Sequence, residues 1–80
     1  MIQPRIAVVV VTYNSGAEIG GCLDALHSLD GRQDSLEIVV VDNASSDSTC
    51  AEVERRGIRL IANRDNLGFA AAVNQGVRAT

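Results

Sequence analysis

The sequence predicts an α/β fold in which three parallel strands alternate with three helices, in the order βαβαβα. Three short apolar runs are each followed by a polar turn and then by a segment whose apolar residues recur every three or four positions. The runs are rich in consecutive valine and isoleucine, which is typical of strands buried on both faces of a parallel sheet. Connections of this length favour right-handed crossovers, so we expect the strand order 3-2-1.

The first strand is predicted at residues 6–11, where every residue is apolar. A polar turn follows, in which Ser15 and Glu18 match a capping box at the start of a helix. That helix is predicted over residues 16–29. The side chains expected to face the sheet are Ile19, Leu23, Leu26 and Leu29.

The second strand is predicted at residues 37–41 and leads into a small polar segment. A second helix begins within residues 45–49, where several side chains suit an N-cap and where Thr49 and Glu52 offer another capping box. It ends at residues 55–57, because arginines favour the carboxyl end of a helix and glycine commonly follows it.

The third strand is predicted at residues 58–62, followed by a polar loop at residues 63–66. A third helix then reaches the end of the chain. Phe69, Val73 and Val77 recur at spacings of four, so we expect this stripe, with Phe69, to belong to the core.

A Rossmann-like sheet in this order places the first strand at an open edge. An apolar strand with unpaired backbone is a liability that intact proteins avoid. We therefore expect a fourth strand to pair there, and residues 1–80 to be the first part of a larger protein.

Composition excludes several classes of protein. The net charge is -3 and the sequence contains no lysine, which argues against nucleic-acid binding. Cys22 and Cys50 lack the spacing of a zinc site, so we expect reduced structural thiols, and we expect His27 to lie on the surface. No segment approaches the ~20 apolar residues of a membrane span. A cytoplasmic location is expected, and peripheral attachment to the membrane through other regions stays open.

Three polar clusters follow the three strands, at residues 12–14, 42–47 and 63–68. In open α/β sheets ligands bind at the carboxyl ends of the strands. Common nucleotide fingerprints are nevertheless absent, because the first turn holds neither G-x-G-x-x-G nor a P-loop. Asp42 does stand where a dinucleotide-binding fold places its ribose-binding acid.

Each cluster belongs to a longer motif. In chain order the motifs are V-V-V-V-T-Y-N-S, E-I-V-V-V-D-N-A-S-S-D-S-T and N-R-D-N-L-G-F-A-A-A-V-N-Q-G. In this order and spacing they resemble the opening motifs of the family-two nucleotide-sugar glycosyltransferases. These enzymes have the GT-A fold and transfer the sugar with inversion of its anomeric configuration. The resemblance covers nearly the whole chain and implies the first half of such a domain.

The resemblance also implies a donor site. The nucleotide would lie against Thr12 and Tyr13 with its base near Asp42, whose carboxylate could accept a hydrogen bond from the N3 hydrogen of uracil or thymine. Arginine suits a base carbonyl or phosphate oxygen, and the start of the third helix offers N–H groups to an anion. The implied binding residues are Thr12, Tyr13, Asn14, Asp42, Asn43, Arg64, Asn66 and Gly68.

The rest of the reaction is implied to lie outside this chain. An Asp-x-Asp motif holding magnesium or manganese is expected after Thr80, and the general base later still, so no catalytic or metal-binding residue is assigned here. The donor would be a UDP- or dTDP-sugar and the acceptor a glycan or lipid-linked hydroxyl. The third motif resembles rhamnosyl- and galactofuranosyl-transferases of bacterial surface polysaccharides, and the 80 residues alone are expected to be inactive.

Other interpretations stay open. The chain could be a nicotinamide-dinucleotide-binding domain, a nucleotidyltransferase, or a non-catalytic α/β nucleotide-binding or interaction module. Asp42 could merely cap a turn, and Asn66 with Gly68 could supply turn geometry. Tyr13 could be an ordinary half-buried ring. Helix capping is the simpler role for Ser45, Ser46 and Asp47.

Overall fold

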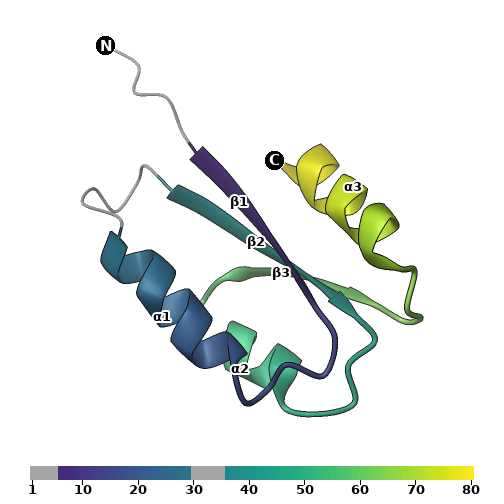
Figure 1. Cartoon of the computed structure of the whole chain (residues 1–80), viewed down its shortest axis with the longest axis horizontal. Helices are drawn as coiled ribbons and strands as arrows, with labels where there is room; N and C mark the ends of the chain where they lie inside the picture. The colour runs from purple at the N-terminus through teal and green to yellow at the C-terminus, as the bar shows by residue number, and fades with distance from the viewer. Residues whose placement is uncertain (1–5, 30–35) are drawn as a thin grey trace.

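The computed structural model describes residues 6–29 and 36–80 and contains a three-stranded parallel sheet with three helices (Figure 1). The strand order is β1-β2-β3, which confirms the predicted order and fold class. In chain order the elements are β1 (Ile6–Thr12), α1 (Ile19–Leu29), β2 (Leu36–Asn43), α2 (Thr49–Arg55), β3 (Arg59–Asn63) and α3 (Phe69–Ala79).

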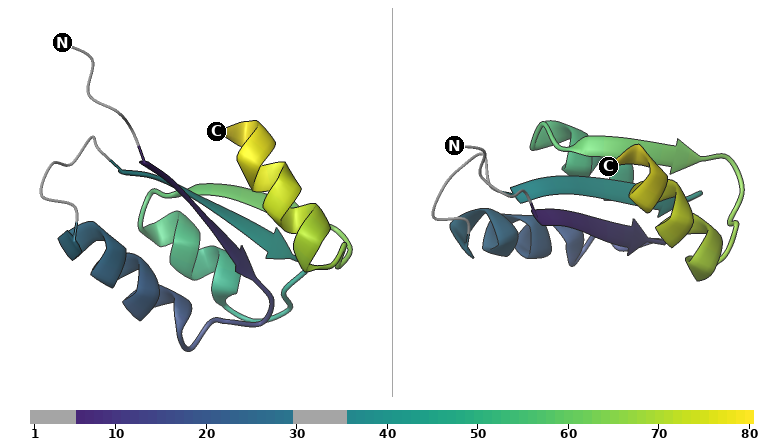
Figure 2. Two further views of the ribbon diagram at one scale, coloured as in Figure 1. Left: turned by 45° about the horizontal axis from the view of Figure 1, so that its top comes forward. Right: turned by 90° about the horizontal axis from the view of Figure 1, so that it is seen from above.

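Helices cover both faces of the sheet, as in a doubly wound fold. Figure 2 shows α1 and α2 on one face and α3 on the other. Alternate residues of β2 point to the two sides, so Val40 packs with the α1–α2 layer while Val39 and Val41 pack with α3. All three valines are fully buried. A continuous valine run is therefore required, because both faces of β2 are core.

The strand β1 lies at one edge of the sheet, and within the described residues it pairs only with β2. Its register places Val9 opposite Val39 and Thr12 opposite Asp42. Ile6 is 62% exposed although it is apolar. The predicted edge position is confirmed.

The α1 helix begins three residues later than predicted, at Ile19. The Ser15 carbonyl accepts hydrogen bonds from the backbone N–H groups of Glu18 and Ile19, but the Ser15 hydroxyl donates to the Tyr13 carbonyl. The predicted capping box is therefore wrong. The next helix also lacks one, since its N-cap Ser48 makes no side-chain cap hydrogen bond.

The predicted core stripe of α3 is wrong. Phe69 is 73% exposed and Val77 58% exposed, whereas Ala72 and Gly76 are buried against the sheet. A Cβ on Gly76 would lie 2.3 Å from Val9 Cγ1. The close approach of α3 to β1 therefore selects small residues on its inner face.

The bounds of all three strands differ slightly from prediction: β1 continues to Thr12, β2 covers Leu36–Asn43 rather than residues 37–41, and β3 covers Arg59–Asn63 rather than residues 58–62. Each strand ends one or two residues later than predicted, because the parallel ladders extend to the pairs Thr12–Asp42 and Asn43–Asn63. The α2 helix ends as predicted, with Arg56 as its C-cap and Gly57 at a φ of 68°.

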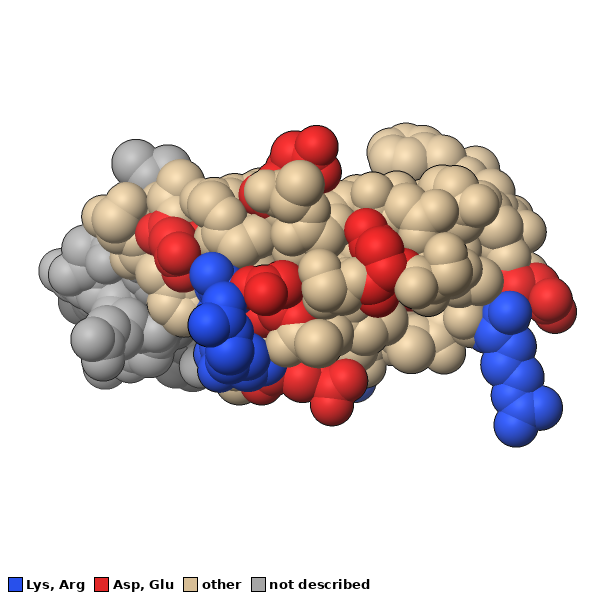
Figure 3. All heavy atoms as spheres, turned by 90° about the horizontal axis from the view of Figure 1, so that it is seen from below, with Lys and Arg blue, Asp and Glu red and all other residues tan. Residues whose placement is uncertain are grey.

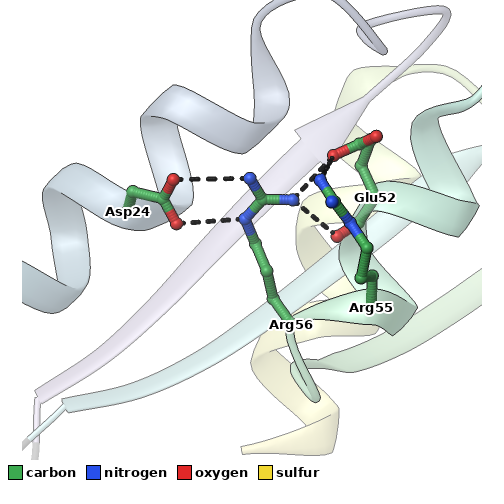
Figure 4. A network of polar contacts seen from close by, with 4 residues as sticks. All are labelled: Asp24, Glu52, Arg55 and Arg56. Carbon is green, nitrogen blue, oxygen red and sulfur yellow. Dashed lines mark hydrogen bonds and ion pairs between the residues drawn. The ribbon is translucent and has the colours of Figure 1, made fainter.

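Arg56 joins the two helices on one face of the sheet (Figure 4). Its guanidinium donates to both carboxylate oxygens of Asp24 on α1 and to Glu52 on α2. A Cβ on Gly20 would lie 2.6 Å from the Arg56 Nη2 atom. Glycine at this helical position therefore leaves room for the ion pair that links α1 to α2.

Candidate functional site

The three polar clusters meet at the carboxyl edge of the sheet. The ladder sets Thr12 opposite Asp42, and Asn43 opposite Asn63. Thr12, Asp42 and Asn43 are all buried, so the strand ends are held by side chains that have little contact with solvent. The loops that carry the exposed residues follow Thr12, Asn43 and Asn63, which are the last residues of the three strands.

Asp42 is almost fully enclosed at this edge, with 1% of its surface exposed. Its Oδ1 accepts from the Thr12 hydroxyl at 2.7 Å and from the Ser45 hydroxyl, and its Oδ2 accepts from the Ser45 backbone N–H at 2.9 Å. The Cys50 thiol lies near the same carboxylate. Burial raises the pKa of Asp42, but the bonds from Ser45 and Thr12 outweigh it, and the pKa lies below its ordinary value.

The opposite shift occurs at Cys50. Burial, together with the nearby Asp42 carboxylate, raises the pKa of the Cys50 thiol to about 11. Cys50 is therefore protonated at neutral pH. Cys22 is exposed, and both cysteines are free, in line with the predicted reduced thiols.

The loops after β1 and β2 are tied to each other by side chains. The Asn14 backbone N–H donates to the Ser45 hydroxyl at 2.7 Å, and the Asn14 side-chain oxygen accepts from the Ser46 N–H. The Gly16 N–H donates to Asp47 at 2.9 Å. The predicted helix-capping role is therefore wrong for Ser45 and Ser46, which bond to the neighbouring loop, whereas Asp47 accepts from the Thr49 N–H at the start of α2.

Both of these loops contain a residue in the left-handed region. Asn14 has a φ of 48° and Ala44 a φ of 66°. Asparagine tolerates this conformation, but for alanine it costs roughly 1–2 kcal/mol. At Ala44 the Asp42–Ser45 hydrogen bond spans the residue and holds it there.

The third loop, between β3 and α3, is held by Asn43. Its side-chain amide donates to the Gly68 carbonyl at 3.1 Å, while its oxygen accepts from the Asn63 side chain and the Leu67 N–H. Asn63 also exchanges two side-chain hydrogen bonds with Gln75 on α3. Asn43 is therefore the residue through which β2 positions the third cluster.

The site residues predicted from sequence fall into two groups. Thr12, Asp42 and Asn43 are buried and bond to other protein groups. The other five are exposed at the mouth of this edge: Tyr13, Asn14, Arg64, Asn66 and Gly68. Gly68 has a φ of 85°, which only glycine adopts readily, so the turn geometry expected there is present.

Sequence reasoning overlooked several residues that shape the site. Cys50 and Gln75 contribute through contacts made only in the folded chain. Asn63 had been recognised only as part of a polar loop. Its place directly opposite Asn43 in the parallel ladder was the signal that could have identified it.

The carboxylates at this edge do not form a cation site. Asp42 is occupied by protein donors, and Asp47 accepts from the Gly16 N–H and from Thr49. No group of three or more histidine, cysteine, aspartate or glutamate side chains suited to a metal ion occurs within residues 6–29 and 36–80. The residues described here therefore do not fit a metal, and no chemical step is assigned to one.

Two surface features complete the description. Acidic side chains are scattered over the face shown in Figure 3, among mostly uncharged ones. His27 is exposed, as predicted. No helix of the described ranges is long and apolar enough to cross a membrane.

Comparison with known proteins identifies the family. The sequence profile of glycosyl transferase family 2 matches residues 7–80. The chain belongs to this family. Among curated relatives, the uncharacterized protein MT1568 of Mycobacterium tuberculosis is 41% identical over 71 residues, which cover 84% of this chain and 21% of the relative.

Solved glycosyltransferases share the fold. The mannosyltransferase PcManGT of Pyrobaculum calidifontis, solved with GDP-Man and Mn²⁺, has a TM-score of 0.89 and 35% identity over 99% of this chain and 25% of that chain. Glucosyl-3-phosphoglycerate synthase of Mycobacterium tuberculosis, solved with UDP, has a TM-score of 0.79 and 24% identity over 96% of this chain and 30% of that one. The family-2 GT-A assignment is therefore confirmed.

The chain spans only 21% to 26% of the length of the curated relatives it matches. The activity, substrates and partners of a whole protein are accordingly treated as proposals.

Proposed function

We propose that this chain binds the nucleotide of a nucleotide-sugar donor at the carboxyl edge of its sheet. The observation that carries the proposal is the convergence of three loops, each fixed by a buried polar side chain, with Tyr13, Arg64 and Asn66 exposed at their mouth. Open α/β sheets bind their ligands at this edge. Family membership and the likeness to a mannosyltransferase solved with GDP-Man support a nucleotide-sugar as the ligand.

Each exposed group has a plausible chemical partner in such a ligand. Tyr13 is 56% exposed and offers an aromatic face beside a base. The Arg64 guanidinium suits two oxygens of a diphosphate. The first turn of α3, which starts after Gly68, presents backbone N–H groups without intrahelical partners to an anion.

We further propose that the whole protein transfers a sugar, with inversion, from a UDP or dTDP donor to a hydroxyl of a glycan or lipid-linked acceptor. The choice of a pyrimidine donor, and of a rhamnosyl- or galactofuranosyl-type transfer in cell-wall polysaccharide synthesis, rests on the resemblance of the motifs. Magnesium or manganese would neutralise charge on the leaving diphosphate. Residues outside 1–80 would supply the metal ligands and the general base. The reaction would take place in the cytoplasm or at the cytoplasmic face of the membrane.

Titration of the chain by calorimetry with UDP, dTDP and GDP tests the proposal. We expect weak but saturable binding, strongest for a pyrimidine diphosphate, and no sugar transfer by these residues alone. Arg64→Ala should weaken binding on the order of tenfold, because a charge-assisted contact is lost. Arg78→Ala, in the last turn of α3, is the matched control and should leave affinity unchanged.

Two results would contradict the proposal. One is the absence of saturable binding for all three diphosphates. The other is equal loss of affinity in Arg64→Ala and Arg78→Ala, which would mean that net charge rather than this edge attracts the nucleotide.

A further inference from the structure

A chain of side-chain amides links α3 to the loop between β3 and α3. Asn63, the last residue of β3, exchanges two hydrogen bonds with Gln75 on α3: its amide nitrogen donates to the Gln75 oxygen at 2.8 Å, and its oxygen accepts from the Gln75 nitrogen at 2.9 Å. The Asn63 nitrogen also donates to the Asn43 side-chain oxygen at 3.1 Å. Both hydrogens of the Asn63 amide are therefore used, and the orientation of that side chain is fixed from two sides.

Asn43 carries this chain of amides into the loop. Its oxygen also accepts from the Leu67 N–H at 3.3 Å, and its amide nitrogen donates to the Gly68 carbonyl at 3.1 Å. These two backbone partners, a donor and an acceptor, have fixed polarity, so they allow Asn43 a single amide orientation. Asn43 then presents its oxygen to Asn63, and Asn63 presents one donor and one acceptor to Gln75. The backbone of the loop therefore sets the polarity of all three amides.

The chain of amides holds the loop at both ends. The ladder places Asn63 opposite Asn43, so the loop begins beside the same side chain that holds its end at residues 67–68. Residues 64–66 lie between these two points and are exposed. Gln75 extends the connection to α3, so the loop and the first turns of that helix are held as one unit.

We propose that Gln75 is a positioning residue for the nucleotide. Acting through Asn63, it holds the loop after β3 so that Arg64 stays at the mouth of the site. This inference rests on the proposed function, since it takes Arg64 as a contact of the diphosphate. Gln75 acts without touching the ligand, because its influence passes through the two hydrogen bonds to Asn63.

Replacement of Gln75 by an apolar side chain of similar length tests this role. Gln75→Met removes both hydrogen bonds to Asn63 and keeps a high helix propensity. We expect the affinity for UDP, measured by calorimetry, to fall about three- to tenfold, because the loop loses its connection to α3. Arg78→Met introduces the same side chain in the last turn of α3 and should keep wild-type affinity. Wild-type affinity in a folded Gln75→Met chain would overturn the proposal.

A double variant tests whether Gln75 acts through Asn63. Asn63→Ala removes the partner of Gln75, so adding Gln75→Met to it should change the affinity for UDP by less than about twofold. A loss in the double variant equal to the product of the two single losses would mean that Gln75 contacts the ligand or supports the fold independently of Asn63. That result would overturn the positioning role.

Amide hydrogen exchange reports on the loop without any nucleotide. The Leu67 N–H, which donates to the Asn43 oxygen, should exchange faster in Gln75→Met than in wild type and at the wild-type rate in Arg78→Met. Unchanged exchange of Leu67 in Gln75→Met would overturn the loop-holding role. Faster exchange, combined with no binding of UDP, dTDP or GDP by the wild-type chain, would uphold the loop-holding role and refute the proposed function.

Discussion

The Thr12 hydroxyl donates a 2.7 Å hydrogen bond to the Asp42 carboxylate, between residues that are paired across β1 and β2. Both side chains are buried, so the bond forms where water contributes little. It connects the last residue of β1 to the next-to-last residue of β2. The relative placement of the first two loops therefore depends on this pair.

Removal of the Thr12 hydroxyl should destabilise the chain. Thr12→Val keeps the shape of the side chain but leaves one acceptor position of a buried carboxylate unfilled, so we expect the free energy of unfolding to fall by about 1–3 kcal/mol. Urea denaturation followed by circular dichroism measures the change. The control is Thr80→Val, whose hydroxyl bonds to the Val77 carbonyl at the exposed end of α3, and it should change stability by less than ~0.5 kcal/mol. Equal losses of unfolding free energy in the two variants would show that the buried hydrogen bond contributes no more to stability than the exposed one.

Acid should remove the stabilisation that ionised Asp42 provides. Its folded-state pKa lies below the ordinary value of 3.8, because hydrogen bonds from Ser45 and Thr12 favour the charged form. The contribution is therefore complete above pH 3.8 and is lost as the pH falls toward the folded-state pKa. The difference in unfolding free energy between wild type and Asp42→Asn should be constant near neutral pH and shrink below pH 3.8. A difference that grows with acid would contradict this assignment.

The inner face of α3 should reject even one added methyl group. Gly76→Ala places a Cβ 2.3 Å from a methyl group of Val9, and overpacking of this kind costs about 1–3 kcal/mol of unfolding free energy. Gly21→Ala is the matched control inside α1, where an added Cβ meets nothing within 4 Å, and it should stabilise the chain by up to about 1 kcal/mol. Thermal unfolding of the two variants should shift in opposite directions. Stabilisation by Gly76→Ala would place α3 further from β1 than described here.

The two cysteines should differ in reactivity. Thiolate is the reacting form, and burial together with the nearby Asp42 carboxylate raises the pKa of Cys50 to about 11. Because pH 8 is about three units below this pKa, only about one in a thousand Cys50 thiols is ionised at that pH. Iodoacetamide followed by mass spectrometry should therefore label the exposed Cys22 first. Faster labelling of Cys50 than Cys22 in the native chain would contradict the raised pKa of the Cys50 thiol.

The strands could be predicted from local sequence because strands buried on both faces require consecutive apolar residues. The valine run of β2 is core on both faces, as its composition predicted. The strand order, with β1 at the edge, followed from connections of the right length for right-handed crossovers. Spacing misled at α3. Its larger apolar residues recur every four positions, but closeness to β1 favours Ala72 and Gly76 on the inner face and leaves Phe69 outside.

The location of the candidate site was predictable, but the division of roles within it was not. Polar residues after parallel strands must meet at one edge. Whether a given carboxylate faces ligand or protein depends on donors supplied from elsewhere in the chain. For Asp42 these include Thr12, thirty positions earlier, and Ser45 in the loop that follows, and sequence spacing does not reveal that either points toward it.

The central claim is that a nucleotide binds at the carboxyl edge of this sheet, and mapping of amide chemical shifts during a UDP titration tests it most directly. We predict that the largest changes fall in residues 12–15, 42–46 and 63–69, with little change around the Arg56 ion pair on the outer side of α1 and α2. Changes concentrated at that ion pair, or no saturable changes with UDP, dTDP or GDP, would contradict the account.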